Sequence, residues 1–224
     1  MSIILKLLLL LGVLFFIFKK IIAGLNIAGL NGATVGRVSP KSAEYFRGFL
    51  SDAKYDAYVK GIVETKNLTQ EVALSKFDLD ESEFNELPPV CLSDYYFDEK
   101  THLMVKKGKD EKWRSSAYQV SWLFFSSEQV CVYQYTLNFR GYEENRVTKQ
   151  YFWKEIVAFN TFEGSKTVII SPKNAKENKT ETVILKLFSL IVPGDELVCA
   201  MPNDDSFDKT IRGMKATLKA KKEG

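Results

Sequence analysis

The feature that most constrains this chain is an apolar run close to its N-terminus. Only Lys6 interrupts the stretch from Ile3 to Phe18, and its last twelve residues carry no charge. A helix of this length reaches about 24 Å, against about 30 Å for the hydrocarbon core of a bilayer. Flanking lysines extend toward the headgroups and reduce that difference. The sequence predicts a single-pass membrane anchor, with contacts from Leu7, Leu11, Phe15, Phe18, Lys19 and Lys20.

Two other interpretations of this run compete with the anchor. A cleaved signal peptide needs small residues at a cleavage site after its apolar core, but Lys19 and Lys20 follow directly and no Ala-x-Ala is present. A buried core helix would have nothing local to pack against. We therefore favour a permanent anchor. The lysine pair places slightly more positive charge after the run than before it, which favours a cytoplasmic body.

The cysteines also bear on the compartment. Cys91, Cys131 and Cys199 are odd in number, and each lies beside apolar residues, as buried reduced thiols do. This pattern agrees with a body on the cytoplasmic side. The alternative is an exported, envelope-associated structural protein that carries the same body on a signal anchor.

Charge and motif content exclude several classes of function. The 31 basic and 28 acidic residues give a net charge of +3, whereas a nucleic-acid-binding chain is usually far more basic. His102 is the one histidine, and the chain has no Cys-x-x-Cys, Gly-rich phosphate loop, Gly-x-Ser-x-Gly or His-Glu-x-x-His motif. We expect no nucleic-acid partner, no cofactor, no metal and no catalytic residue. An enzyme with an unrecognised pocket is the least favoured alternative.

The segment after the anchor is predicted to be helical. Ser39 and Pro40 form a helix start, and apolar spacing continues to about Glu64. A second short helix is expected over residues 68–77, and a third turn over 81–86. Residues 68–99 hold nine acids and one lysine, a charge that repels DNA phosphates. We interpret this segment as a small helical bundle with an acidic, solvated face.

The second half of the chain is rich in aromatic residues and strand patterns. Strands are predicted over residues 90–97, 118–125, 130–139, 148–162, 168–171, 182–192 and 197–201, with a turn at 163–165. A terminal helix follows Asp204 to Ser206. Its apolar stripe is formed by Phe207, Ile211, Met214 and Leu218.

A basic loop between the first two strands is the best candidate contact surface in the sequence. As a hairpin tip it needs no function, because charged turns are normally solvated. Its bases could also contact anionic lipid or a partner. The candidate residues are Lys106, Lys107, Lys109, Lys112, Trp113 and Arg114.

Two aromatic stretches carry a family resemblance. They read Trp113-Arg-Ser-Ser-Ala-Tyr-Gln-Val-Ser-Trp-Leu-Phe-Phe-Ser-Ser-Glu-Gln-Val-Cys-Val-Tyr-Gln-Tyr135 and Tyr151-Phe-Trp-Lys-Glu-Ile-Val157. Together with the stretch from Phe77 to Pro89, they resemble uncharacterised bacterial membrane-anchored proteins with a pleckstrin-homology-like domain. The likeness covers about residues 68–162.

The resemblance implies a fold but no reaction and no ligand residues. The expected fold class is α+β: an N-terminal transmembrane helix, a short helical segment, and a bent antiparallel β-barrel closed by a C-terminal α-helix. The expected parts are an anchor and flexible juncture (1–36), a helical segment (37–88) and the barrel with its helix (89–224). The expected function is a non-enzymatic interaction module at the membrane, which binds a protein partner or anionic lipid headgroups.

Overall fold

The computed structural model describes residues 39–77, 80–97, 103–141, 143–170 and 179–223. The predicted anchor residues and His102 lie outside this part of the chain. The chain divides between Val35 and Gly36, and residues 36–224 form one compact unit, here called the body. Within the described ranges, no helix has the length and apolar character needed to cross a membrane.

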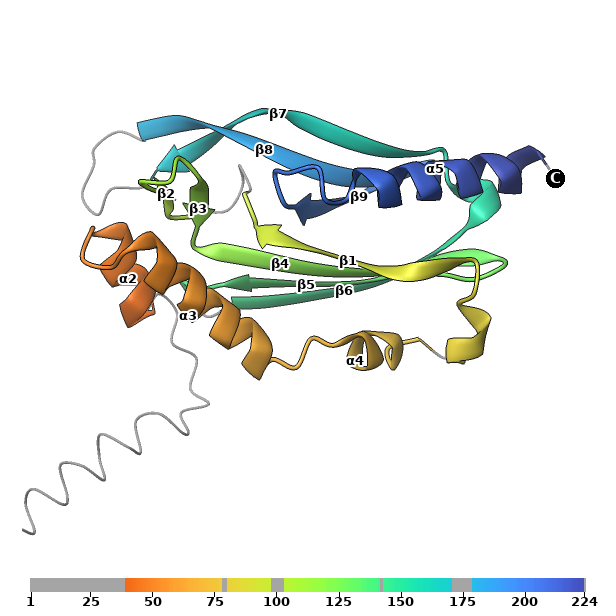
Figure 1. Ribbon diagram of the computed structural model, residues 1–224, viewed down its shortest axis with the longest axis horizontal. Coiled ribbons are helices and arrows are strands. Elements are labelled where there is room, and N and C mark those ends of the chain that lie inside the picture. The colour runs from red at the N-terminus through yellow and green to blue at the C-terminus, as the bar shows by residue number, and fades with distance from the viewer. Residues whose placement is uncertain (1–38, 78–79, 98–102, 142, 171–178, 224) are drawn as a thin grey trace, which may run out of the picture. The chain divides into compact units, whose positions relative to one another are not determined.

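The body contains two antiparallel sheets, which Figure 1 shows as two layers. The four-stranded sheet has the order β1 (Leu87–Tyr95), β4 (Ala117–Phe125), β5 (Gln129–Asn138) and β6 (Glu143–Phe152). The three-stranded sheet has the order β7 (Ala158–Ile170), β8 (Lys179–Val192) and β9 (Asp195–Met201). A separate hairpin is formed by β2 (Val105–Lys107) and β3 (Trp113–Ser115).

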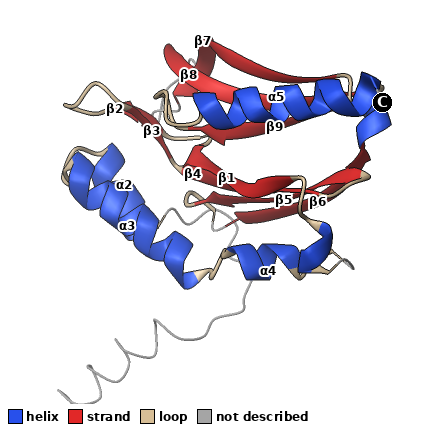
Figure 2. Cartoon of the chain, turned by 45° about the vertical axis from the view of Figure 1, so that its right-hand side comes forward, coloured by secondary structure: helices blue, strands red, loops and turns tan. Residues whose placement is uncertain are grey.

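Helices surround these sheets (Figure 2). They are α2 (Pro40–Phe46), α3 (Asp52–Thr65), α4 (Gln70–Leu74) and α5 (Asp208–Glu223), with 3-10 turns η1 (Glu81–Glu83) and η2 (Trp153–Glu155). The α+β class with antiparallel sheets and a C-terminal helix packed on strands is therefore confirmed.

The first predicted helix begins as expected but ends early. The Ser39 side chain caps α2 by accepting a hydrogen bond from the Ser42 amide at 3.1 Å. The prediction of one helix to about Glu64 is wrong, because Gly48 adopts a φ of 89°. Its amide bonds back into α2, as does that of Phe49, and this pair of bonds is the Schellman helix ending that glycine favours. The chain then restarts as α3.

The helices α2 to α4 cover one face of the four-stranded sheet. Aromatic side chains dominate this layer, and the rings of Tyr45 and Tyr55 stack with centroids 4.2 Å apart. The indole of Trp122 donates to the Leu68 carbonyl at 3.0 Å, which fixes the chain before α4 to the sheet. Because these contacts bury the helices on the strands, the helical segment is part of the same compact unit as the sheets.

The opposite face of that sheet forms the central core with the second sheet and α5. The predicted stripe of the terminal helix is confirmed, since Ile211, Met214 and Leu218 are buried in this core and Phe207 packs at its margin. At the far end of α5, Lys221 donates to Glu86 at 2.8 Å. The helix therefore docks along its length.

Two strand boundaries differ from the prediction. The expected strand over 148–162 is divided by η2, and the expected turn at 163–165 lies within the continuous strand β7. Gly164 allows this path because the Phe162 ring lies over it, where an added Cβ would approach the ring to 2.6 Å. The glycine therefore accommodates a neighbouring ring and does not mark a turn.

Two buried glutamines join the sheets. Gln119 on β4 accepts a hydrogen bond from the Ala200 amide at 2.7 Å, and Gln134 on β5 donates to the Val198 carbonyl at 2.9 Å. Both bonds reach the backbone of β9 from the neighbouring sheet. Side chains therefore satisfy part of the backbone of this strand, as buried polar groups require.

Candidate functional site

The basic hairpin β2–β3 is fastened to α3 by a buried arginine. The Arg114 residue is 3% exposed. Its Nε and Nη2 donate to the two carboxylate oxygens of Asp56, both at 2.7 Å, and Nη1 and Nη2 donate to those of Asp110, both at 2.8 Å. These hydrogen bonds raise the pKa of the guanidinium and hold that of Asp110 well below its usual range.

A second carboxylate extends this attachment. Asp52, in the first turn of α3, accepts hydrogen bonds from the Tyr45 hydroxyl at 2.9 Å and the Lys109 amide at 2.8 Å. Lys106 donates to the Tyr45 carbonyl at 3.0 Å, and its ammonium lies 4.2 Å from the centroid of that ring. The hairpin is thus held on the helical layer at several points.

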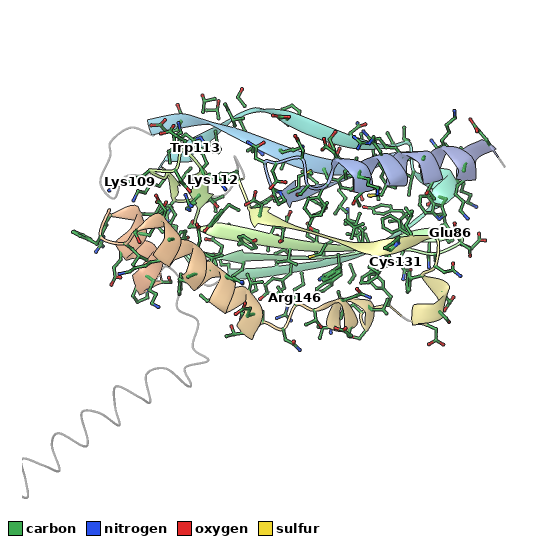
Figure 3. All side chains as sticks on the ribbon, in the orientation of Figure 1. Glu86, Lys109, Lys112, Trp113, Cys131 and Arg146 are labelled. Carbon is green, nitrogen blue, oxygen red and sulfur yellow. The ribbon has the colours of Figure 1, made fainter. Side chains whose placement is uncertain are left out.

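The six residues of the predicted contact surface do not all face solvent in the structure. Arg114 and Lys106 face inward, as described above, and Trp113 is half-buried beside the cluster that joins the hairpin to β7 and β8. Lys107 is exposed and forms an ion pair with Glu111. Lys109 and Lys112 are exposed (Figure 3), and among the described residues they form no ion pair. The hairpin therefore presents fewer available bases than its sequence suggests.

A cavity of about 960 Å³ opens beside this hairpin. Its walls come from α3, the ends of β1 and β9, the hairpin and the part of β8 that passes above it. The apolar lining includes Val59, Val63, Ile184, Leu187 and Met201. Ile184 is 60% exposed, an unusual setting for a large aliphatic residue in the middle of a strand.

Asp94 is a partly buried acid in the wall of the cavity. It projects from β1, accepts the Tyr95 amide at 2.7 Å, and forms no ion pair with any described residue. Burial raises the pKa of its carboxyl to about 6, and the negative charges of Asp204 and Asp56 add to this, while that amide and Lys112 oppose it. A basic group entering the cavity would find an acceptor that is only partly satisfied.

Sequence reasoning selected residues of one wall of this cavity, the hairpin with Lys107, Lys112, Trp113 and Arg114, but none of its other walls. Asp94 did leave a signal, because it is an acid inside the apolar strand predicted over 90–97. Asp56 and Ile184 left none, since an acid on an amphipathic helix and an isoleucine in a strand are ordinary. Their role follows from elements that are distant in sequence and adjacent in the fold.

The described residues also bear on metal binding and on thiol reactivity. They contain no group of three or more His, Cys, Asp or Glu side chains arranged to hold a metal ion. Cys91 is partly buried and Cys131 and Cys199 are buried, all as free thiols. Burial raises their pKa values to about 11, 12 and 11, which disfavours the nucleophilic thiolate.

Comparison with known proteins gives no match to this chain among protein-family models, curated proteins or solved structures.

Proposed function

We propose that this chain is a membrane-anchored, non-enzymatic interaction module that binds a segment of a protein partner in the cavity beside the hairpin. The partner segment would place an apolar side chain against Ile184 and a basic side chain near Asp94. Residues 7–20 would hold the module in the bilayer. The body would lie on the cytoplasmic side.

The architecture supports a pleckstrin-homology-like body. Such folds join a four-stranded antiparallel meander to a three-stranded one and end in an α-helix. Here β1, β4, β5 and β6 are the four strands, β7 to β9 are the three, and α5 follows. The hairpin β2–β3 is then an insertion between the first two strands. Fold alone does not assign a ligand, so the partner is argued from the cavity.

The observation that carries the proposal is the composition of this cavity. An exposed aliphatic side chain and a half-buried carboxylate, which forms no ion pair with the residues that the structure describes, line the same concave surface. Binding sites commonly combine an apolar lining with a few polar groups that fix orientation. A cationic side chain would both pair with Asp94 and favour its ionised form.

Free thiols support the cytoplasmic placement. All three cysteines are unpaired, as is usual in a reducing compartment. The alternative placement, an exported envelope-associated body, is tested by topology. A reporter fused after Gly224 should be protected from added protease in intact cells if the body is cytoplasmic. Digestion of that reporter would favour export.

Site-specific photocrosslinking tests the proposed binding site. A photoreactive residue at position 184, in the full chain in its membrane, should form a defined protein adduct. The adduct should weaken strongly when Asp94→Lys is added, because the carboxylate becomes a like charge for the basic group.

Val157 provides the matched control for this experiment. It is 54% exposed and lies just before β7, away from the cavity. A photoreactive residue there should not form the same adduct. Equal adducts from both positions, or an adduct at 184 that Asp94→Lys leaves unchanged, would overturn the cavity as the binding site.

A further inference from the structure

The turn between α2 and α3 presents a large apolar side chain to solvent. This Phe49 turn comprises residues 47–51, and Phe49 itself is 80% exposed, the highest value among the exposed large hydrophobic residues described. Its backbone position is fixed, because its amide donates to the Glu44 carbonyl at 2.9 Å. The ring is therefore displayed by a well-defined helix ending.

The sequence explains why the ring has no cover. In a Schellman ending, the residue after the glycine commonly packs against an apolar side chain three or four positions before the helix cap. The cap here is Arg47, so those positions are Glu44, an exposed acid, and Ala43, which offers one methyl group. Phe49 thus lacks a large local apolar partner.

Basic residues lie near Phe49 along the chain and on the adjoining hairpin. Arg47 and Lys54 are exposed before and after it in the sequence, and Lys109 is brought to the start of α3 because its amide bonds to Asp52. Within the described residues, none of the three bases forms an ion pair.

The acids of this region are largely engaged. Asp110 is held by Arg114, and Glu111 pairs with Lys107. Asp52 accepts its two hydrogen bonds from neutral donors and keeps its charge, and Glu44 is exposed beside the turn. Three available bases therefore outnumber two uncompensated acids near an exposed aromatic ring.

We propose that the Phe49 turn docks on the anionic surface of the bilayer that holds the anchor, with the ring in the interface and the three bases over headgroups. This inference rests on the membrane anchoring proposed above. The described part of the body begins at Ser39, and the short helix α2 places the turn about 10 Å beyond that residue. An aromatic ring flanked by bases is the combination that anionic interfaces attract.

Depth-sensitive fluorescence on the full chain in vesicles tests this docking. A Ser51→Cys reporter keeps Phe49 in place, and the Ser51 side chain makes no capping hydrogen bond that would be lost. An environment-sensitive dye there should shift to the blue in vesicles of phosphatidylcholine and phosphatidylserine. Lipids with a nitroxide near the headgroup should quench it.

An Ala216→Cys reporter is the matched control, since Ala216 is exposed on α5, at the other end of the body from α2 (Figure 1). It should show neither the shift nor the quenching. The native thiols should stay largely unlabelled at pH 7, because their pKa values are raised by burial. The chain without an added cysteine measures that background.

Two changes identify the contacts. Phe49→Ser should lower the quenching at the Ser51→Cys reporter to the control level, whereas Val157→Ser, at another exposed apolar residue, should not. Replacing Arg47, Lys54 and Lys109 with Gln should weaken docking about a hundredfold at low salt.

The outcomes separate the docking from the anchor. Release of the full chain from the vesicles by a carbonate wash would refute the membrane anchor, and this inference rests on that anchor. A retained chain whose Ser51→Cys reporter is quenched no more than the Ala216→Cys reporter would refute the docking alone. That second result is also expected if the turn instead binds a protein, since the vesicles contain lipid only.

Discussion

Arg114 on β3 and Asp56 on α3 form a two-point ion pair, with both nitrogen–oxygen distances at 2.7 Å. The two residues are 58 positions apart in the sequence and come from different layers of the body. The arginine side chain is 4% exposed, whereas the aspartate side chain is 44% exposed. The buried guanidinium of Arg114 therefore depends on carboxylates to compensate its charge, whereas the carboxylate of Asp56 can also be hydrated.

Removing this arginine should destabilise the body. We expect Arg114→Met to lower the free energy of unfolding by about 2 kcal/mol, because Asp56 and Asp110 lose the charge-assisted hydrogen bonds that brace the hairpin on α3. The loss is smaller than for a fully buried ion pair, since both carboxylates are partly exposed and can be hydrated. Urea denaturation of the body measures it.

Lys112→Met is the control for that change, because it removes a base from the same hairpin at an exposed position. It should alter the free energy of unfolding by about 0.5 kcal/mol or less. Equal losses for the two variants would contradict the bracing role of Arg114.

Asp94 should make the stability of the body fall as the pH rises. Its pKa is about 6 in the folded state and near 4 when unfolded, so the penalty for its charge is absent below pH 4 and complete above pH 6. We expect Asp94→Asn to stabilise the body by about 2 kcal/mol at pH 7 and to make no difference near pH 3.5. Denaturation curves of both proteins at the two pH values measure this.

Asp204 lines the same cavity and provides a control, because its pKa is shifted in the opposite direction. Hydrogen bonds from Ser206 lower the pKa of its carboxyl, so its stabilising contribution is present at neutral pH and is lost as the pH falls through that lowered value. Asp204→Asn should therefore destabilise at pH 7. If Asp94→Asn also destabilised at pH 7, the burial argument for Asp94 would fail.

The terminal helix should depend on its apolar stripe. Ile211 is buried against the central core, so Ile211→Ala should cost about 2 to 4 kcal/mol. Lys219 is exposed, and Lys219→Ala should stay within about 0.5 kcal/mol. Thermal or urea unfolding compares them, and similar losses would mean that α5 does not dock.

The apolar N-terminal run should retain the full chain in membranes. We expect the protein to stay in the membrane fraction after high-salt and carbonate washes, because residues 3–18, apolar except for Lys6, favour the hydrocarbon core. A shortened chain that begins at Gly36 should remain in the supernatant, since residues 36–224 form a compact unit. Release of the full chain by carbonate would contradict an integral anchor.

Local patterns were sufficient for many elements of the body. Capping by Ser39, the apolar and aromatic runs near 118–125 and 130–139, and the stripe of the last helix each depend on neighbouring residues. The break at Gly48 was missed because apolar spacing continues on both sides of it. The periodicity of α3 resembles a continuation of α2, and only the backbone conformation at the glycine separates them.

The cavity could not be predicted, for a different reason. The sequence around Arg114 is rich in lysine and acidic residues, as is typical of a solvated turn. Nothing in that sequence indicates that its partner Asp56 lies on an earlier helix. Likewise, the wall provided by Ile184 depends on β8 passing over the hairpin. Contacts between segments distant in the chain are fixed by packing, which a single sequence does not display.

The hydrogen bonds from the glutamines to β9 affect how the body unfolds. For the two sheets to separate at this strand, the Ala200 amide must lose its bond to Gln119, and the Val198 carbonyl must lose its bond from Gln134. If β9 opened only in part, these buried backbone and side-chain groups would lack both their protein partners and water, so fraying of β9 alone is unfavourable. Hydrogen exchange at the Ala200 amide should therefore follow global unfolding, and the last strand should behave as a cooperative part of the first sheet.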